Sequence, residues 1–128
     1  MTEPTKEQDE LAHRVIGAAI EVHRRLGPGY LESIYEEALA VEFDRCEIKY
    51  ARQHEISVDY RGRKIGIARL DFLVGDNLIV ELKAVETIAP IHQAQVFSYL
   101  KMTGLELGLL INFNLRTLKE GIKRIILT

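Results

Sequence analysis

The clearest pattern in this sequence is a short apolar run, Leu78–Ala84, that is interrupted by two opposite charges, Glu81 and Lys83. A nearly continuous apolar run of this length predicts a strand covered on both faces of a sheet. Because side chains alternate along a strand, both charges would point to one face and Leu82 to the other. Burying an ion costs several kcal/mol unless something neutralises it. The pattern therefore predicts a functional site on this strand.

A second apolar run, Leu70–Val74, is interrupted by a single acid, Asp71. The segment Gly75–Asn77 between the two runs has the composition of a tight turn. A hairpin would bring Asp71 and Glu81 onto neighbouring antiparallel strands, close enough to share one ion. By alternation, five residues of the longer strand are expected on one face: Ile65, Ile67, Arg69, Asp71 and Leu73.

Apolar periodicity and turn residues place the other elements around this hairpin. Helices are predicted over about residues 6–26, 31–45 and 90–102, and strands over about 56–60, 64–74, 78–84 and 107–113. Residues 122–127 suit either an edge strand or a short terminal helix. The order ααβββαββ predicts an α/β fold, in which a mixed β-sheet is flanked by helices.

Composition narrows the class of protein. The 128 residues predict a single domain over 1–128, with 47% hydrophobic and 28% charged residues as in a soluble protein. We expect no membrane segment, because no apolar run approaches the roughly 18 residues of a span. We also expect no signal peptide, because the amino-terminal residues Met1–Glu7 do not resemble one. Cys46 is the single cysteine, which is typical of a reducing cytoplasm. The net charge of -2 argues against a histone-like coat but does not exclude a nuclease.

The two acids indicate a specific chemistry. The carboxylates of Asp71 and Glu81 are hard oxygen ligands, which Mg²⁺ and Mn²⁺ prefer. The backbone carbonyl of Leu82 is a further candidate ligand. A cation held there would polarise a phosphodiester and acidify a water molecule. Lys83 would act on that water or on the phosphate. The alternative is structural, namely a buried salt bridge between Lys83 and one of the acids.

Asp71, followed after a hairpin by Glu81-Leu82-Lys83, resembles the core motif of the PD-(D/E)XK nuclease superfamily. The segment Gln95–Tyr99 is similar to the Q-x-x-x-Y signature of the branch related to RecB nucleases. Gly29–Tyr35 matches the signature that names the GxxExxY proteins, and residues 89–95 and 109–114 also resemble that family. The resemblance covers about residues 11–127 and implies a restriction-endonuclease-like core. Leu70 departs from it, because the superfamily often has proline before the first acid.

The resemblance also implies roles for individual residues. Lys83 would be the catalytic lysine, Gln95 would contact metal-bound water or substrate, and Tyr99 would brace Gln95 or face the nucleic acid. For Gln95 and Tyr99, the alternative is a helix that packs its edge on the sheet. For Glu32, the alternative is stabilisation of the first helical turn. Three acids would bind Mg²⁺ or Mn²⁺: Asp71, Glu81 and Glu32.

Together these observations predict a metal-dependent nuclease that hydrolyses phosphodiester bonds of nucleic acid, with DNA preferred over RNA. A homodimer or a partner protein is compatible with the small size. The basic cluster Arg61–Lys64 is the best candidate for a phosphate contact, because loop tips reach substrate. The alternative function is a binding or regulatory module that kept the nuclease fold and lost catalysis. The intact set of polar residues favours the enzyme, and the near-neutral charge favours the module.

Overall fold

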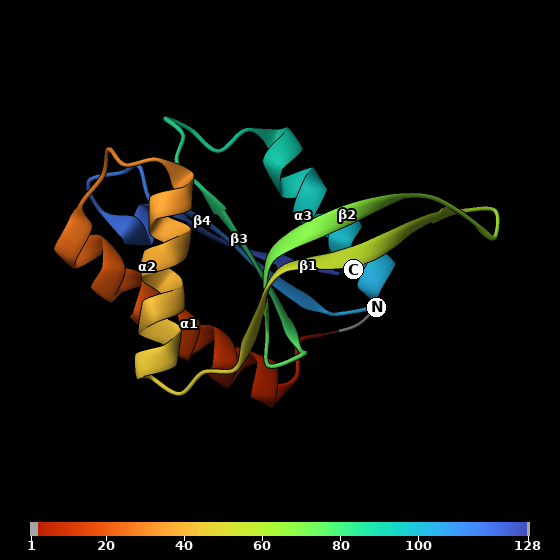
Figure 1. The fold of residues 1–128 in the computed structure, drawn as a ribbon, viewed down its shortest axis with the longest axis horizontal. Coiled ribbons are helices and arrows are strands. Elements are labelled where there is room, and N and C mark those ends of the chain that lie inside the picture. The colour runs from red at the N-terminus through yellow and green to blue at the C-terminus, as the bar shows by residue number, and fades with distance from the viewer. Residues whose placement is uncertain (1–2, 128) are drawn as a thin grey trace.

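A computed structural model describes residues 3–127 and confirms the predicted order of elements, with one short 3₁₀ helix added before the last strand (Figure 1). Residues 1–2 and 128, at the ends of the predicted domain, lie outside the described residues. Residues 122–126 form a strand rather than a helix. The elements are α1 Lys6–Leu26, α2 Glu32–Arg45, β1 Tyr50–Tyr60, β2 Arg63–Val74, β3 Leu78–Lys83, α3 Pro90–Thr103, β4 Leu107–Asn112, η1 Leu118–Gly121 and β5 Ile122–Ile126.

The five strands form one mixed sheet in the order β1-β2-β3-β4-β5. Strands β3 and β4 are parallel and are connected through α3, whereas all other neighbours are antiparallel. β3 is central, and every residue from Leu78 to Leu82 is buried, as its apolar run predicts. The charged residues of β3 therefore lie at the middle of the sheet.

Helices cover both faces of this sheet. Helices α1 and α2 pack on one face, where the aromatic side chains of Tyr35, Phe43, Phe72 and Phe113 are fully buried. Helix α3 packs on the other face through Val96, Tyr99 and Leu100. Within residues 3–127, no helix combines the length and the apolar character needed to cross a bilayer.

Strand β2 changes its facing at Asp71. Leu70 and Leu73 both pack on the α3 side, whereas Phe72 packs on the side of α1 and α2. Strict alternation would have put Leu70 and Leu73 on opposite faces. By alternation Ile67 lies on the face opposite to Ala68 and Leu70, so the prediction that Leu73 shares a face with Ile67 is wrong. Gln53 of β1 lies opposite Asp71 in the strand register and has φ 48°, a sparsely populated conformation for a residue with a side chain.

Gly108 sets the distance between α3 and the sheet. A Cβ at this position would lie 2.7 Å from Val96 Cγ1. We expect Gly108→Ala to displace α3 and to lower the free energy of unfolding by about 1–3 kcal/mol, as overpacking does. Gly17→Ala is the control, because its Cβ would meet nothing within 4 Å and alanine favours the helix. Thermal melts should show opposite shifts, and equal melting temperatures of Gly108→Ala and the wild type would contradict the close approach.

Candidate active site

The predicted acids Asp71 and Glu81 meet where the β2–β3 ladder ends. The last backbone pair of this ladder is Phe72 with Val80. Beyond it, the Asp71 N–H donates to Glu81 Oε1 at 2.7 Å, and the Leu82 N–H donates to Asp71 Oδ2 at 2.8 Å. Each carboxylate thus takes the place of a carbonyl acceptor on the neighbouring strand. This geometry confirms that the two acids lie side by side on adjacent antiparallel strands.

Burial controls the protonation of this pair. Glu81 is 4% exposed, and its burial, together with the Asp71 charge, raises the pKa of Glu81 to about 8. Burial also raises the pKa of Asp71, and the hydrogen bond from the Leu82 N–H opposes this shift in part. Two carboxylates in one desolvated site cannot both ionise at low cost. The pair therefore favours either a shared proton or a bound cation at neutral pH.

Lys83 lies two residues after Glu81 on the same strand and is half-buried. Its ammonium forms no ion pair with any carboxylate of residues 3–127. The buried salt bridge considered above is therefore not formed. The Lys83 charge nevertheless lowers the pKa values of Glu81, Asp71 and Glu32, so its ammonium lies within electrostatic range of all three acids.

Glu32 reaches the same region from the first residue of α2. Burial raises the pKa of Glu32 most, the Asp71 charge raises it further, and Lys83 lowers it. Its carboxyl thus lies within electrostatic range of Asp71 and Lys83, so Glu32 does more than add negative charge to the first turn of the helix. In the described part of the chain, however, no three His, Cys, Asp or Glu side chains are arranged to hold a metal ion. Metal ligation by Glu32 stays a prediction.

The buried Tyr35 explains why Glu32 comes to this place. The Tyr35 hydroxyl donates to the Gly27 carbonyl at 2.6 Å and accepts from the Tyr30 N–H at 3.2 Å. Its ring stacks on Phe113, with ring centres 4.7 Å apart. These contacts fix the turn between α1 and α2 to the sheet. This turn therefore positions Glu32, the first residue of α2, near the carboxylate pair.

Two asparagines at the end of β4, Asn112 in the strand and Asn114 just after it, hold the neighbouring loops. The Asn112 side chain, 1% exposed, accepts from the Val85 N–H and donates to the Val85 carbonyl. Asn114 Oδ1 accepts from the Gly29 N–H at 3.1 Å, where φ of 109° suits glycine. These bonds fix the chain just after Lys83 and just before α2. Gly29 lies in the Gly29–Tyr35 segment, and both asparagines lie in the segment 109–114. These two motif segments therefore hold the loops beside the site in place.

Gln95 and Tyr99 approach the pair from α3. Tyr99 is 8% exposed and packs with Val96 on the sheet, as the structural alternative predicts. Burial raises the pKa of Tyr99 most, and the charges of Glu81 and Asp71 raise it further, so its hydroxyl also faces the acids. The exposed Gln95 side chain contacts this hydroxyl. Both residues lie beside the carboxylates, and their catalytic roles stay predictions.

Gln53 is a site residue that the sequence analysis missed. Its amide donates to Asp71 Oδ1 at 3.3 Å and to Glu36 Oε1 at 2.7 Å, so it links β2 to α2. Glu36 is also paired with Arg52 at 2.7 Å. The sequence pattern predicted this strand from about Ile56 onward, although β1 begins at Tyr50. Extending the hairpin register backward would have placed Gln53 opposite Asp71, whereas its positive φ leaves no trace in the sequence.

The donor atoms present fit a hard divalent cation. Asp71 and Glu81 offer carboxylate oxygens. When both are ionised, the negative charge of this desolvated pair exceeds the positive charge of Lys83. The Leu82 N–H points toward Asp71, and in a strand the carbonyl of the same residue points to the same neighbour. The Leu82 carbonyl is therefore directed toward the carboxylates as a further oxygen donor. Oxygen-rich sites of this kind suit Mg²⁺ and Mn²⁺.

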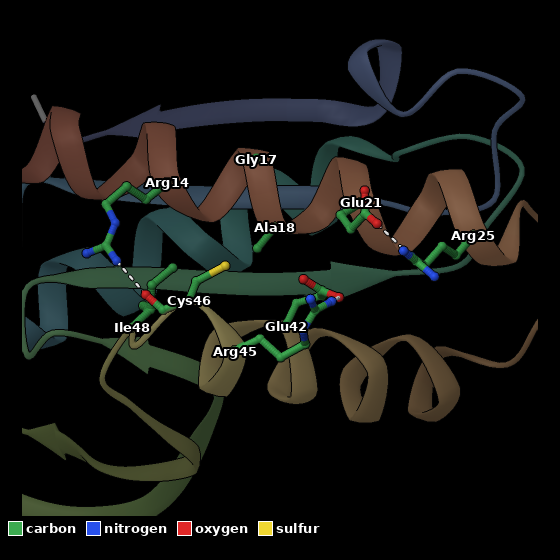
Figure 2. Close-up of a pocket in the computed structure, with 9 residues that line it drawn as sticks. All are labelled: Arg14, Gly17, Ala18, Glu21, Arg25, Glu42, Arg45, Cys46 and Ile48. Atoms are coloured by element: carbon green, nitrogen blue, oxygen red, sulfur yellow. Dashed lines mark hydrogen bonds and ion pairs between the residues drawn. The ribbon is translucent and has the colours of Figure 1, made fainter.

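A separate cavity of about 470 Å³ opens between α1 and α2 (Figure 2). Two of its arginines are paired with acids, Arg25 with Glu21 and Arg45 with Glu42. Arg14 donates to the Cys46 carbonyl at 2.8 Å. Glu42 lies ten residues after Glu32 on α2, which corresponds to about 15 Å along the helix. None of the predicted site residues lines this cavity, so it forms no part of the carboxylate site.

Comparisons with known proteins agree with this geometry. A search of curated proteins gave no significant match. Among solved structures, an alkaline exonuclease from Laribacter hongkongensis aligns with a TM-score of 0.54 and 16% identity, over 100% of this chain and 73% of that chain. At this identity the likeness concerns the fold. Residues 9–125 match the profile of the PD-(D/E)XK nuclease superfamily. Because this match spans most of the sequence, the chain belongs to the PD-(D/E)XK nuclease superfamily.

Proposed function

We propose that this protein is a nuclease that depends on Mg²⁺ or Mn²⁺ and hydrolyses phosphodiester bonds of DNA in preference to RNA. The observation that supports this best is the buried Asp71–Glu81 pair beside the Lys83 ammonium, which forms no ion pair with an acid of residues 3–127. Such a pair is costly without a cation, and a purely structural site would have paired Lys83. The motifs at Gly29–Tyr35 and Gln95–Tyr99 support a finer placement, with the GxxExxY proteins and the branch related to RecB nucleases.

Each residue has a distinct task in this proposal. Asp71 and Glu81 hold the cation, which when bound supplies positive charge that stabilises the phosphorane-like transition state and lowers the pKa of water. Lys83 neutralises a phosphate oxygen as the ammonium, or takes a proton from the attacking water after the ammonium has released its own proton. Gln95 positions the water or the phosphate, and Tyr99 holds the Gln95 amide in place. Glu32 adds negative charge that strengthens cation binding from the α2 side.

A cleavage panel tests the proposal. We expect the wild-type protein with Mn²⁺ or Mg²⁺ to cut labelled DNA, and to cut RNA more slowly. Chelation with EDTA should stop cleavage. Asp71→Ala should reduce it to background, because the variant loses one of two charged ligands and the acceptor for the Leu82 N–H. Calorimetric titration with Mn²⁺ should show binding to the wild type and none to Asp71→Ala. Cleavage that persists in EDTA would contradict the metal requirement.

A second candidate function is a binding module without catalysis. The observation that favours it is that no three acidic or histidine side chains within residues 3–127 are arranged to hold a metal ion. Such a module should bind nucleic acid equally well with and without Mn²⁺, and should cut no member of the panel. Cleavage by the wild type together with loss of cleavage in Asp71→Ala would exclude this candidate. Cytoplasmic location and dimer formation stay predictions.

A further inference from the structure

The hairpin of β1 and β2 is longer than the core of the protein requires. In Figure 1 it projects from the body of the molecule, beyond the helices that cover the sheet. Every residue from Asp59 to Ile65 is exposed. Three large apolar side chains in or next to this part are also exposed, and such residues are usually buried: Tyr60 63%, Ile65 65% and Ile67 52%. The projecting end thus contributes little to folding and is available for contact with another molecule.

The tip of this hairpin carries cations that the protein does not neutralise. Arg61, Arg63 and Lys64 surround Gly62 in the turn, and none of them forms an ion pair with a carboxylate of residues 3–127. Elsewhere most arginines are paired with acids: Arg24, Arg25, Arg45, Arg52, Arg69 and Arg124. The concentration of free positive charge at one exposed tip indicates an anionic partner.

The shape of the hairpin fits a groove of duplex DNA. The major groove of B-form DNA admits a two-stranded β-ribbon, whereas the deep and narrow major groove of an RNA duplex does not. The register shifts between Val58 and Asp59, so Ile65 is an extra residue on β2. Such a bulge increases the twist of a ribbon, and a twisted ribbon can follow a helical groove. Cations at the tip would then contact phosphates at the groove edge.

The hairpin also connects this contact to the proposed site. Strand β2 begins at the tip with Arg63 and carries Asp71, which lies nine positions after Gly62. At 3.3 Å per residue this is up to about 30 Å, or about nine base pairs where the arm runs parallel to the axis of the duplex. We propose that the β1–β2 hairpin is an arm that enters a groove of duplex DNA and binds phosphates about nine base pairs from the bond that is cut. This proposal rests on the proposed nuclease function.

Binding measurements without metal test the arm directly. The probe is a fluorescent DNA duplex of about 24 base pairs in EDTA, titrated at several salt concentrations. The variant combines Arg61→Ala, Arg63→Ala and Lys64→Ala. Three exposed lysines far from the tip provide a control with the same loss of charge: Lys6→Ala, Lys49→Ala and Lys123→Ala. All six positions are exposed, so melting temperatures should match the wild type.

We expect the tip variant to bind the long duplex about 10²-fold more weakly at 0.1 M salt. The slope of log K against log salt should fall by about 2–3 in magnitude, because each lost phosphate contact removes about 0.9. For the control variant, the magnitude of this slope should fall by less than about 1. On a duplex of about 8 base pairs the tip cannot reach phosphates while the site is occupied, so variant and wild type should bind equally. An RNA duplex should show no difference between them.

Two results would contradict the proposal that the β1–β2 hairpin is a DNA-binding arm. One is an equal loss of affinity in the tip variant and the control variant, and the other is the same loss on short and long duplexes. These outcomes are distinct from failure of the proposed nuclease function. Wild-type protein that binds the long duplex through the tip but cuts nothing with Mn²⁺ would contradict the nuclease and support the arm. Wild-type protein that cuts DNA, with a tip variant that binds and cuts as the control does, would contradict the arm alone.

Discussion

Lys83→Ala is expected to lose about 10²–10⁴-fold of the cleavage rate while it retains the fold. A positioned acid–base or charge-neutralising group typically contributes this much. The structure separates this expectation from a structural role, because Lys83 forms no ion pair with an acid of residues 3–127. Truncation therefore strands no directly paired buried carboxylate, which would cost about 3–5 kcal/mol. We expect a loss of about 1 kcal/mol or less in the free energy of unfolding.

Cleavage kinetics and thermal melts of the same variants check this prediction. Lys123→Ala is the control, since Lys123 is exposed on β5. Lys83→Arg keeps the charge, but arginine does not release a proton. Recovery of activity in Lys83→Arg would show that charge on the phosphate is enough, and continued loss would indicate proton transfer. A large fall in melting temperature for Lys83→Ala, with cleavage unchanged, would make Lys83 a structural residue.

The sequence predicted those parts of the fold that depend on local periodicity. The uninterrupted apolar run around Ile79 is buried on both faces, and the turn at Gly75–Asn77 does pair β2 with β3. The same reasoning put Asp71 beside Glu81, because a hairpin register follows from the length of its turn. These features are local along the chain. They need no knowledge of how the distant elements pack.

The parts that could not be predicted depend on contacts between distant segments. The change of facing of β2 at Asp71 lies opposite the unusual backbone of Gln53, and no residue type marks that conformation in the sequence. At Asp71 and Leu82 the backbone N–H groups donate to carboxylates instead of to carbonyls of the neighbouring strand. This arrangement likewise depends on how far β2 and β3 separate. Tyr35 stands in the sequence as the last residue of the Gly29–Tyr35 motif, and its hydroxyl bond to the Gly27 carbonyl depends on the turn before α2. Tertiary packing, rather than periodicity, determines these details.

The protonation of Glu81 predicts how stability depends on pH. Burial, followed by the Asp71 charge, raises the pKa of Glu81 in the folded protein from its ordinary value of 4.5 to about 8. Between these values the folded protein keeps a proton that the unfolded chain releases. The free energy of unfolding must therefore fall as pH rises through this window. Because one pKa unit corresponds to about 1.4 kcal/mol and the proton is shared with Asp71, we expect a loss of about 2–4 kcal/mol without metal.

Glu81→Gln should remove this dependence. A glutamine keeps an oxygen that accepts the Asp71 N–H, and it carries no charge at any pH. In EDTA, denaturant melts between pH 5 and 9 should therefore be flatter for the variant, which should be more stable than the wild type at pH 9. Glu10→Gln is the control, because Glu10 is exposed and should leave the wild-type slope unchanged. Added Mg²⁺ should stabilise the wild type at pH 9 and leave Glu81→Gln unaffected, since the cation replaces the proton between the two carboxylates. Parallel pH profiles for Glu81→Gln and the wild type would mean that Glu81 ionises as easily in the folded protein as in the unfolded chain. The carboxylate pair would then not need a cation to neutralise it.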